Sequence, residues 1–206
     1  LMSGSGRLQI PLVMRGFMVD GVDNSRAMLE KFQERCAAFQ ISPIAFEQSL
    51  EEMNLPDRSY ELAIIAVASF QLINERKQAL ACLKKIYEHM TNEGIILIDL
   101  FSPDKDQEFP PGVERLAQLD DRYAIRQTVR YMVREQDKIL EGHCHYALIE
   151  DGKIIQDESE IISIVWYEDD DFIALVLEAG FAVKKIHEVE FERGHVSRIV
   201  EAKIGE

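Results

Sequence analysis

Residues 1–25 hold the feature that most constrains the fold: a glycine turn, a short helix and a strand that ends in an acid. The turn covers residues 3–7 (SGSGR), the helix is predicted over residues 8–15, and an apolar strand over residues 17–22 leads to Asp23. In α/β proteins a unit of this order, with roughly 20 residues from first glycine to acid, holds a nucleoside. Glycines let the backbone approach the ligand, the helix N-terminus offers N–H groups, and the carboxylate can accept ribose hydroxyls. An α/β protein with a nucleoside site is therefore expected.

The sequence opens at Leu1, directly against this turn. A nucleotide-binding turn normally follows the C-terminal end of a central parallel strand. We expect that strand either to lie in residues outside this sequence or to be represented by Leu1-Met2 alone.

Helical and strand patterns then alternate as in a doubly wound, mostly parallel sheet. Ser25 can cap a helix whose apolar positions recur at helical spacing, and a second amphipathic helix is predicted over residues 74–90. Uninterrupted apolar runs are typical of strands covered on both faces, and they predict strands over residues 44–46, 62–68 and 94–100.

Residues 103–167 have a different pattern and are predicted to form an inserted β lobe. A loop is expected over residues 104–121, followed by three alternating segments at 123–135, 139–150 and 154–167. These predict an antiparallel, three-stranded lobe for the substrate. The α/β core then comprises residues 1–102 and 168–206, and it closes with a helix over 172–179 and strands over 181–189 and 196–204.

Composition narrows the classes of partner. The formal net charge of −14 opposes binding to nucleic acid, because counterion release requires clustered Lys and Arg. Three widely spaced cysteines form neither a disulfide framework nor a zinc spacing, which favours a cytoplasmic location. No apolar run approaches the roughly 20 residues that span a bilayer, so no membrane partner is expected. The expected partners are a small-molecule substrate and a second copy of the chain in a homodimer.

Two nucleosides fit the bare geometry of Gly4, Gly6 and Asp23: a dinucleotide and S-adenosylmethionine (SAM). The dinucleotide fingerprint requires a third glycine where this chain has Gln9. The chain also ends with a helix and two strands rather than a second mononucleotide-binding half. These features favour SAM, with a nicotinamide-linked reductase as the alternative.

The sequence resembles the class I SAM-dependent methyltransferases, in particular small-molecule methyltransferases with a β-rich insert, over nearly its whole length. Residues 3–8 resemble the end of the family's first motif, whose preceding strand is not included. Other matching segments are the ribose-binding strand end at 22–25, the adenine-contacting segment at 48–52, the fourth strand and its continuation at 60–65 and 69–71, and the late helix-to-strand junction at 177–181.

This resemblance implies a Rossmann-like methyltransferase fold with SAM as cofactor. The implied cofactor contacts are Gly4, Ser5, Gly6, Asp23, Asn24, Ser49, Leu50 and the backbone near Ala66 and Val67. The chain departs from the family at Ser49, where an Asp is usual. It also has Ala68 and Leu72 where family members often carry polar residues.

The family implies in-line transfer of a methyl group that a positive sulfur already activates. The protein then mainly positions the reactants and excludes water, and a base is needed only if the nucleophile arrives protonated. No catalytic residue is assigned; His143, His145 and Tyr146 in the insert are the candidates.

Two further interpretations concern a metal site and a non-catalytic protein. The His143-Cys144-His145 run lacks a further ligand at metal spacing, so no metal site is expected. The departures at Ser49, Ala68 and Leu72 leave open a non-catalytic ligand-binding or assembly protein on the same fold.

Overall fold

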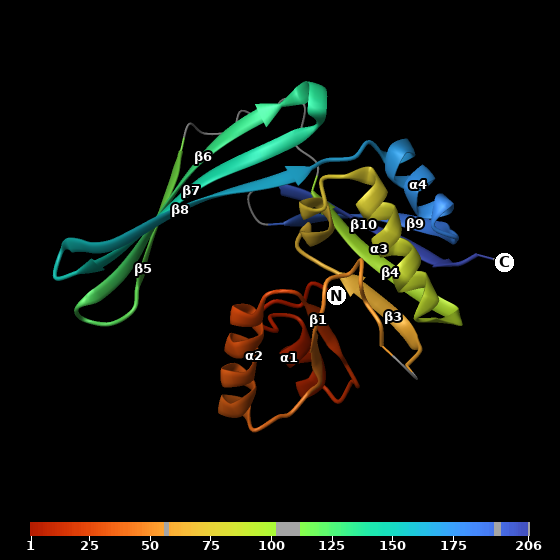
Figure 1. Cartoon of the computed structure of the whole chain (residues 1–206), viewed down its shortest axis with the longest axis horizontal. Helices are drawn as coiled ribbons and strands as arrows, with labels where there is room; N and C mark the ends of the chain where they lie inside the picture. The colour runs from red at the N-terminus through yellow and green to blue at the C-terminus, as the bar shows by residue number, and fades with distance from the viewer. Residues whose placement is uncertain (56–57, 102–111, 192–194, 206) are drawn as a thin grey trace. The chain divides into compact units, whose positions relative to one another are not determined.

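The computed structural model describes residues 1–55, 58–101, 112–191 and 195–205, which divide into two units (Figure 1). Unit 1 comprises Leu1–Phe101 with Glu168–Glu206, and unit 2 comprises Ser102–Tyr167. The elements of unit 1 are α1 (Gln9–Met14), β1 (Gly21–Asp23), α2 (Arg26–Phe39), β2 (Ala45–Glu47), β3 (Tyr60–Ile65), the 3₁₀ helix η1 (Ser69–Leu72), α3 (Arg76–Glu88), β4 (Met90–Phe101), α4 (Asp169–Glu178), β9 (Phe181–Phe191) and β10 (His195–Ile204).

Unit 1 contains two sheets. Strands β1 and β2 form a parallel pair, and a four-stranded sheet has the order β3-β4-β10-β9. In the larger sheet β3 and β4 are parallel, whereas β10 is antiparallel to both β4 and β9. The predicted parallel pairing thus holds for the first four strands, and the doubly wound arrangement stays a prediction.

The first residues of the chain lie between these two sheets. The Leu1 nitrogen donates a hydrogen bond of 2.9 Å to the Ile64 carbonyl on β3. The Ser3 N–H donates one of 3.0 Å to the Val22 carbonyl on β1. Residues 1–3 therefore connect β1 to β3 through main-chain hydrogen bonds.

Two predicted strands are shorter than expected. The strand predicted over residues 17–22 begins only at Gly21, because its partner β2 offers three residues for pairing. Strand β3 ends at Ile65, and the prediction that it reaches Ala68 is wrong. Val67 and Ala68 have positive φ angles of 58° and 53°, which no β-strand accommodates.

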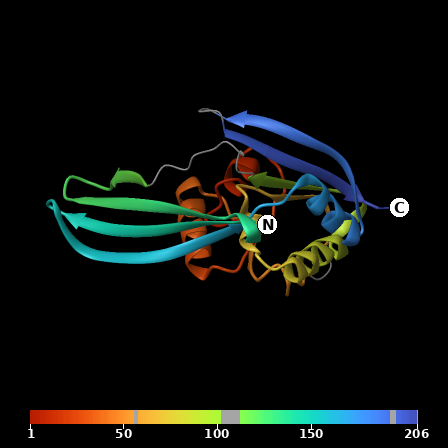
Figure 2. The same ribbon diagram turned by 90° about the horizontal axis from the view of Figure 1, so that it is seen from above.

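The helices of unit 1 bury apolar faces as their periodicity predicts. The Ser25 hydroxyl accepts a hydrogen bond of 3.4 Å from the Met28 N–H, so the predicted cap of α2 is confirmed. Helices α3 and α4 lie on the same side of the four-stranded sheet (Figure 2). Edge-to-face ring pairs fill the space beside them: Phe70 with Phe172 at 5.7 Å and Tyr87 with Phe181 at 5.2 Å. Among the described residues, no helix combines the length and the apolarity that crossing a membrane requires.

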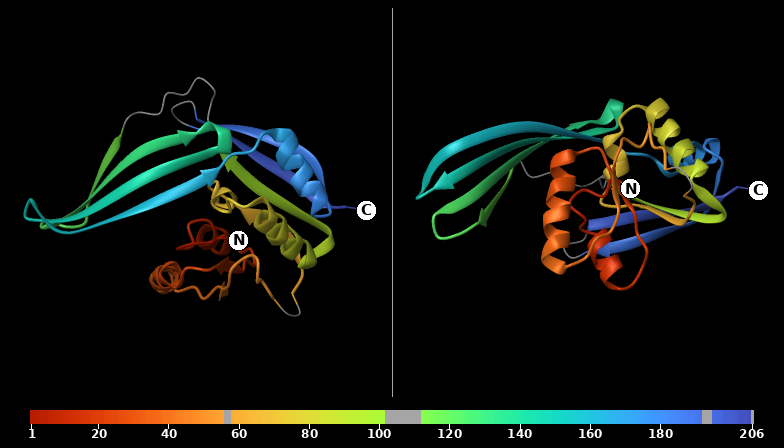
Figure 3. Two further views of the ribbon diagram at one scale, coloured as in Figure 1. Left: turned by 45° about the horizontal axis from the view of Figure 1, so that its top comes forward. Right: turned by 60° about the horizontal axis from the view of Figure 1, so that its bottom comes forward.

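Unit 2 is an antiparallel sheet of four strands, not the predicted three (Figure 3). The order is β5 (Val113–Gln118), β6 (Tyr123–Arg134), β7 (Ile139–Glu150) and β8 (Lys153–Val165), with the 3₁₀ helix η2 (Glu135–Asp137) between β6 and β7. Strand β5 lies within residues 104–121, which were predicted to be a loop; residues 102–111 lie outside the described residues. Its charged sequence lacks a clear apolar alternation. It becomes a strand by pairing with β6 over six residues.

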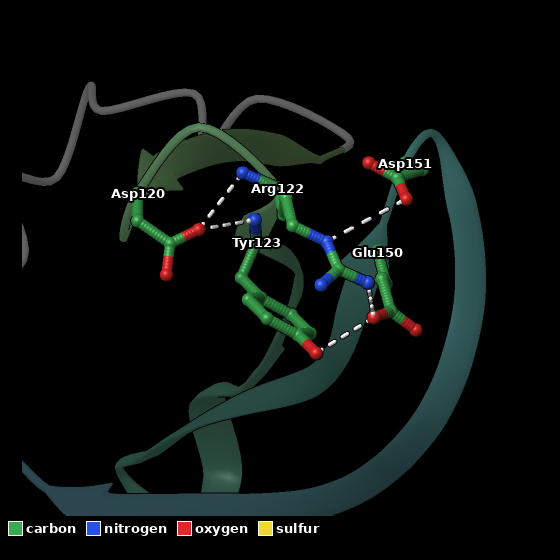
Figure 4. Close-up of polar contacts among 5 residues, drawn as sticks. All are labelled: Asp120, Arg122, Tyr123, Glu150 and Asp151. Atoms are coloured by element: carbon green, nitrogen blue, oxygen red, sulfur yellow. Dashed lines mark hydrogen bonds and ion pairs between the residues drawn. The ribbon is translucent and has the colours of Figure 1, made fainter.

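The turn that leads into β6 is held by polar contacts (Figure 4). One oxygen of Asp120 accepts hydrogen bonds of 2.8 Å from the N–H groups of Arg122 and Tyr123. The Tyr123 hydroxyl donates to Glu150 at 2.6 Å, and the Arg122 guanidinium contacts the same carboxylate at 2.5 Å. Arg122 also lies 3.7 Å from Asp151, so this end of the β6–β7 pair is linked through side chains.

Candidate functional site

The Asp23 carboxylate at the end of β1 contacts the glycine turn directly. Its Oδ2 accepts a hydrogen bond of 2.7 Å from the Gly4 N–H, and its Oδ1 accepts one of 2.9 Å from the Ser25 N–H. Each carboxylate oxygen has about two acceptor positions, so each retains capacity for a further donor. The glycine turn and the acid, 19 residues apart in sequence, are therefore joined by a direct hydrogen bond.

The two glycines of the turn meet different surroundings. Both have positive φ angles, 52° at Gly4 and 77° at Gly6, which other residues rarely adopt. A Cβ atom at Gly4 would meet nothing within 4 Å, so this side of the turn is open to a ligand. A Cβ at Gly6 would lie 2.3 Å from the Phe32 ring on α2. Gly6 is therefore required by packing against the helix, whereas Gly4 leaves space.

Arg35 on α2 secures the middle of the turn. Its guanidinium Nη1 donates to the Ser5 carbonyl at 2.8 Å and approaches the Ser5 hydroxyl at 3.3 Å. The sequence contained no signal for this contact, because it joins residues 30 positions apart through a helix that the motif does not describe.

A hollow of about 230 Å³ lies beside the end of β1. It brings together four of the predicted cofactor residues, Asp23, Asn24, Ser49 and Leu50. The other predicted residues, Gly4, Ser5, Gly6, Ala66 and Val67, do not contribute to its lining. Of the remaining lining residues, Val22 belongs to the expected ribose-binding strand end, Gln48 and Glu51 belong to the expected adenine-contacting segment, and Leu72 is one of the departures from the family. Sequence reasoning assigned no role to Met2, Ile73, Gln78 and Cys82.

For two of the lining residues without an assigned role, the sequence pattern gives part of the answer. Gln78 and Cys82 are four positions apart on α3, so they share one face of that helix. Periodicity could place them side by side, but only the fold shows that this face borders the hollow.

Ser49 and Leu50 belong to a loop that side-chain hydrogen bonds hold in place. The Gln48 side chain accepts a hydrogen bond from the Asn54 N–H at 2.9 Å and donates one to the Asn54 carbonyl at 3.2 Å. The Leu55 N–H donates to Nε2 of His89 at 2.9 Å. Since Nε2 accepts, the His89 proton resides on Nδ1, which lies 2.8 Å from the Lys85 carbonyl. Both ends of the loop are thus fixed by side-chain contacts with the main chain.

The charges at the hollow are acidic. Among its described lining residues, Asp23 and Glu51 are the acids, and none is Lys, Arg or His. Burial raises the pKa of the Cys82 thiol to about 12, with a further contribution from Glu51, so the thiol is neutral at physiological pH. Such a lining suits a neutral or cationic ligand and opposes a pyrophosphate.

A second hollow, of about 650 Å³, lies on the sheet of unit 2. His143 and His145 both line it, and each contacts a carboxylate: Glu141 at 3.3 Å and Asp157 at 3.1 Å. Its other lining residues are Thr128, Arg130, Cys144, Ser159, Glu160 and Ile161.

Tyr146 points to the opposite face of that sheet from the two histidines. Successive side chains of a strand alternate between faces, which separates Tyr146 from His143 and His145. Its hydroxyl donates to Glu160 at 2.9 Å and accepts from Gln127 at 3.1 Å. The three predicted catalytic candidates therefore do not converge. Among the residues that the structure describes, no group of three or more His, Cys, Asp or Glu side chains could hold a metal ion.

Comparison with known proteins identifies relatives. Residues 1–94 match the family model of a methyltransferase domain. A protein of Geobacillus sp. (strain WCH70), whose name assigns it provisionally to the methyltransferases, is 26% identical over 195 residues, which are 89% of this chain and 72% of that protein.

Solved structures share the fold. An S-adenosylmethionine-dependent methyltransferase from Clostridium acetobutylicum ATCC 824 is 15% identical with a TM-score of 0.80, and the match covers 100% of this chain and 82% of that chain. The sugar N-methyltransferase KedS8 from Streptoalloteichus sp ATCC 53650 is 14% identical with a TM-score of 0.82, covering 100% and 78%. These likenesses identify a Rossmann-like α/β fold. The resemblance predicted from the sequence is confirmed to this extent: residues 1–94 match the methyltransferase domain family, and the chain shares the fold of solved S-adenosylmethionine-dependent methyltransferases.

Proposed function

We propose that this protein transfers a methyl group from SAM to a small-molecule acceptor, with the cofactor's adenosyl group at the hollow beside β1. The observation that carries this proposal is the position of Asp23. Its carboxylate joins the glycine turn to a hollow that Asn24, Ser49 and Leu50 also line. When bound, SAM supplies a methyl group already activated by a positively charged sulfur.

The residues at the hollow suit a ribose and a purine. Asp23 already accepts two backbone N–H groups, and its remaining lone pairs can accept the two ribose hydroxyls. The Ser49 hydroxyl accepts the Glu52 N–H at 3.3 Å, so its own proton is available for a ring nitrogen. Leu50 adds an apolar surface, being 7% exposed.

The acidic lining supports SAM over a nicotinamide dinucleotide. A pyrophosphate would meet Asp23 and Glu51 with no cationic side chain among the described lining residues. A sulfonium would instead gain favourable Coulomb energy from the same acids. Gln9 occupies the position of the third glycine in the dinucleotide fingerprint. Its side chain donates hydrogen bonds to the Val19 and Ile44 carbonyls at 3.0 and 2.9 Å, so this position serves the structure of the turn, which argues against a dinucleotide.

Unit 2 is the proposed substrate lobe. His143 and His145 each contact a carboxylate, which orients an imidazole that can accept a proton from an acceptor nucleophile. A small-molecule acceptor is supported by the sugar N-methyltransferase among the structural relatives. The net charge of −14 favours a neutral or cationic acceptor over a polyanion.

Calorimetric titration tests the cofactor site. SAM and its demethylated product are expected to bind, and Asp23→Ala is expected to weaken SAM at least tenfold, because the ribose loses charge-assisted hydrogen bonds worth about 1.5–3 kcal/mol each. Asp20→Ala is the matched control. Asp20 contacts Arg58 at 2.6 Å and Tyr60 at 2.7 Å and does not line the hollow, so SAM affinity should stay within twofold.

Several outcomes would contradict this assignment. Unchanged SAM affinity in Asp23→Ala removes the ribose role of that residue. Stronger thermal stabilisation by NAD(P)H than by SAM supports the reductase alternative. SAM binding without methyl transfer to amine, carboxylate or phenol acceptors supports a non-catalytic ligand-binding protein. The apolar Leu72 at the hollow is compatible with that alternative.

A further inference from the structure

The connection that follows β3 contains a strained turn. Val67 and Ala68 have φ angles of 58° and 53°, in the left-handed region. Two consecutive non-glycine residues in this region are unusual, and a β-branched residue such as Val is a true outlier there. Strained residues of this kind persist only where surrounding contacts hold them, and they concentrate at functional sites.

Asp99 on β4 holds the first residue of this turn. Its Oδ2 accepts a hydrogen bond of 2.7 Å from the Val67 N–H. Its Oδ1 accepts a hydrogen bond from the Ser197 hydroxyl on β10. Strand β4 pairs with β3 on one side and β10 on the other, so the Asp99 backbone is fixed within the sheet. The fixed Asp99 carboxylate therefore holds the Val67 N–H, and with it the left-handed conformation of Val67.

The turn leads directly into a wall of the proposed cofactor hollow. The Ser69 hydroxyl closes the turn by donating to the Ala66 carbonyl at 2.8 Å, and η1 follows. The Gln71 side chain donates to the Phe101 carbonyl at 2.9 Å and accepts from the Phe101 N–H at 2.6 Å. The next two residues, Leu72 and Ile73, line the hollow. Residues of β4 therefore hold both ends of the segment that leads to this wall.

We infer that Asp99 is a positioning residue, which keeps the strained Val67–Ala68 turn in place and thereby sets the Leu72–Ile73 wall of the cofactor hollow. This inference rests on the proposed function for its effect on SAM, whereas the holding of the turn can be measured without ligand. Asp99 acts through the Val67 amide and does not line the hollow itself. Without the carboxylate, the turn loses the contact that opposes its relaxation to a strain-free conformation.

Asp99→Ala tests the inference by two measurements on the full chain. Amide hydrogen exchange without ligand is expected to become at least tenfold faster in a peptide that covers residues 67–73. SAM affinity by calorimetry is expected to fall five- to twentyfold. Glu201→Ala is the matched control. It removes a β10 carboxylate that contacts His187 at 2.7 Å, and both readouts should stay within twofold of the unsubstituted protein.

A second substitution separates strain from simple destabilisation. Glycine adopts positive φ at no steric cost, so Val67→Gly should raise the melting temperature of Asp99→Ala and recover at least half of the lost SAM affinity on a logarithmic scale. Exchange at residues 67–73 that Asp99→Ala leaves unchanged would overturn the inference. So would a Val67→Gly change that lowers the melting temperature in the Asp99→Ala background. If the unsubstituted protein binds no SAM while Asp99→Ala still speeds exchange, the proposed function fails and the holding of the turn stands.

Discussion

Units 1 and 2 use polar side chains in different ways. In unit 1 the described side chains near the proposed site mostly bond to the main chain of a distant segment. Examples are Gln9 with Val19 and Ile44, Asp23 with Gly4, and Gln71 with Phe101. In unit 2 the described polar contacts are mostly between side chains on neighbouring strands, such as His145 with Asp157 and Tyr146 with Glu160.

The difference follows from what holds each unit's backbone. The strands of unit 2 other than β5 are twelve or thirteen residues long, and main-chain pairing along their length already determines their register. Side chains there add cross-strand pairs worth roughly 0.2–1 kcal/mol each. Unit 1 also has connecting segments whose main chain does not pair with a strand. There, a side chain supplies the hydrogen bond that a neighbouring strand would supply, and it determines the path of the chain. Polar side chains in unit 1 therefore determine the path of its connections, whereas those in unit 2 link strands that main-chain pairing already holds.

The largest loss of stability is expected when the buried Gln71 side chain, which bonds to the Phe101 main chain, is removed. Gln71 is 0% exposed, and Gln71→Leu would leave the Phe101 N–H and carbonyl without that partner. We expect a loss of about 2–4 kcal/mol in the free energy of unfolding, measured by urea denaturation, because buried unsatisfied groups carry their full desolvation cost.

The matched change in unit 2 is Gln127→Leu. Its amide donates to the Tyr146 hydroxyl, which keeps its bond to Glu160. The expected loss is below about 1 kcal/mol. Equal losses in the two variants would show that the two units do not differ in this respect.

A smaller effect on stability is expected from the ionisation of one tyrosine in each unit. Burial, followed by the bond to Asp20, raises the pKa of Tyr60 in unit 1 to about 12. Burial and the bond to Glu160 raise the pKa of Tyr146 in unit 2 to about 12 as well. A raised folded-state pKa favours the neutral phenol, so its stabilising contribution is complete below pH 10 and is lost as the pH rises through about 12.

The measurement is an absorbance titration of tyrosinate on the native protein. Tyr60→Phe and Tyr146→Phe should each remove one late-titrating group, and both variants should lose less stability than the parent protein between pH 10 and 12. A late-titrating population that survives in the double variant at its original size would contradict the assignment.

The smallest effect is expected at the end of the β6–β7 pair. Arg122 contacts Glu150 and Asp151, but its side chain is 61% exposed. Arg122→Ala should cost at most about 1 kcal/mol, and added salt should reduce the difference, because solvent screens exposed ion pairs. Thermal unfolding at low and high salt measures this. A loss as large as that of Gln71→Leu would mean that the side chains in Figure 4 determine the fold of unit 2.

Local sequence patterns were sufficient for most helices and strands. The periodicity of Met28, Leu29, Phe32 and Cys36 predicted α2; Leu29, Phe32 and Cys36 are buried, whereas Met28 is exposed. Period-two alternation predicted β6, β7 and β8. The spacing between the glycine turn and Asp23 predicted that both belong to one nucleoside site, and the structure adds a direct hydrogen bond from the Gly4 N–H to the Asp23 carboxylate. Each of these features depends on interactions close in sequence.

Tertiary structure alone decided the features that depend on distant partners. Val113–Gln118 became a strand because the edge of β6 was available, although its own alternation is weak. Strand β3 ended at Ile65 because Asp99, 32 residues away from Val67, holds the turn that follows. Leu72, Gln78 and Cys82 reached the hollow through packing of η1 and α3. The chain alone determined which segments are helical or extended, because that choice is local. Which side chains meet around the ligand site depends on contacts between segments far apart in sequence, and only the folded chain brings those segments together.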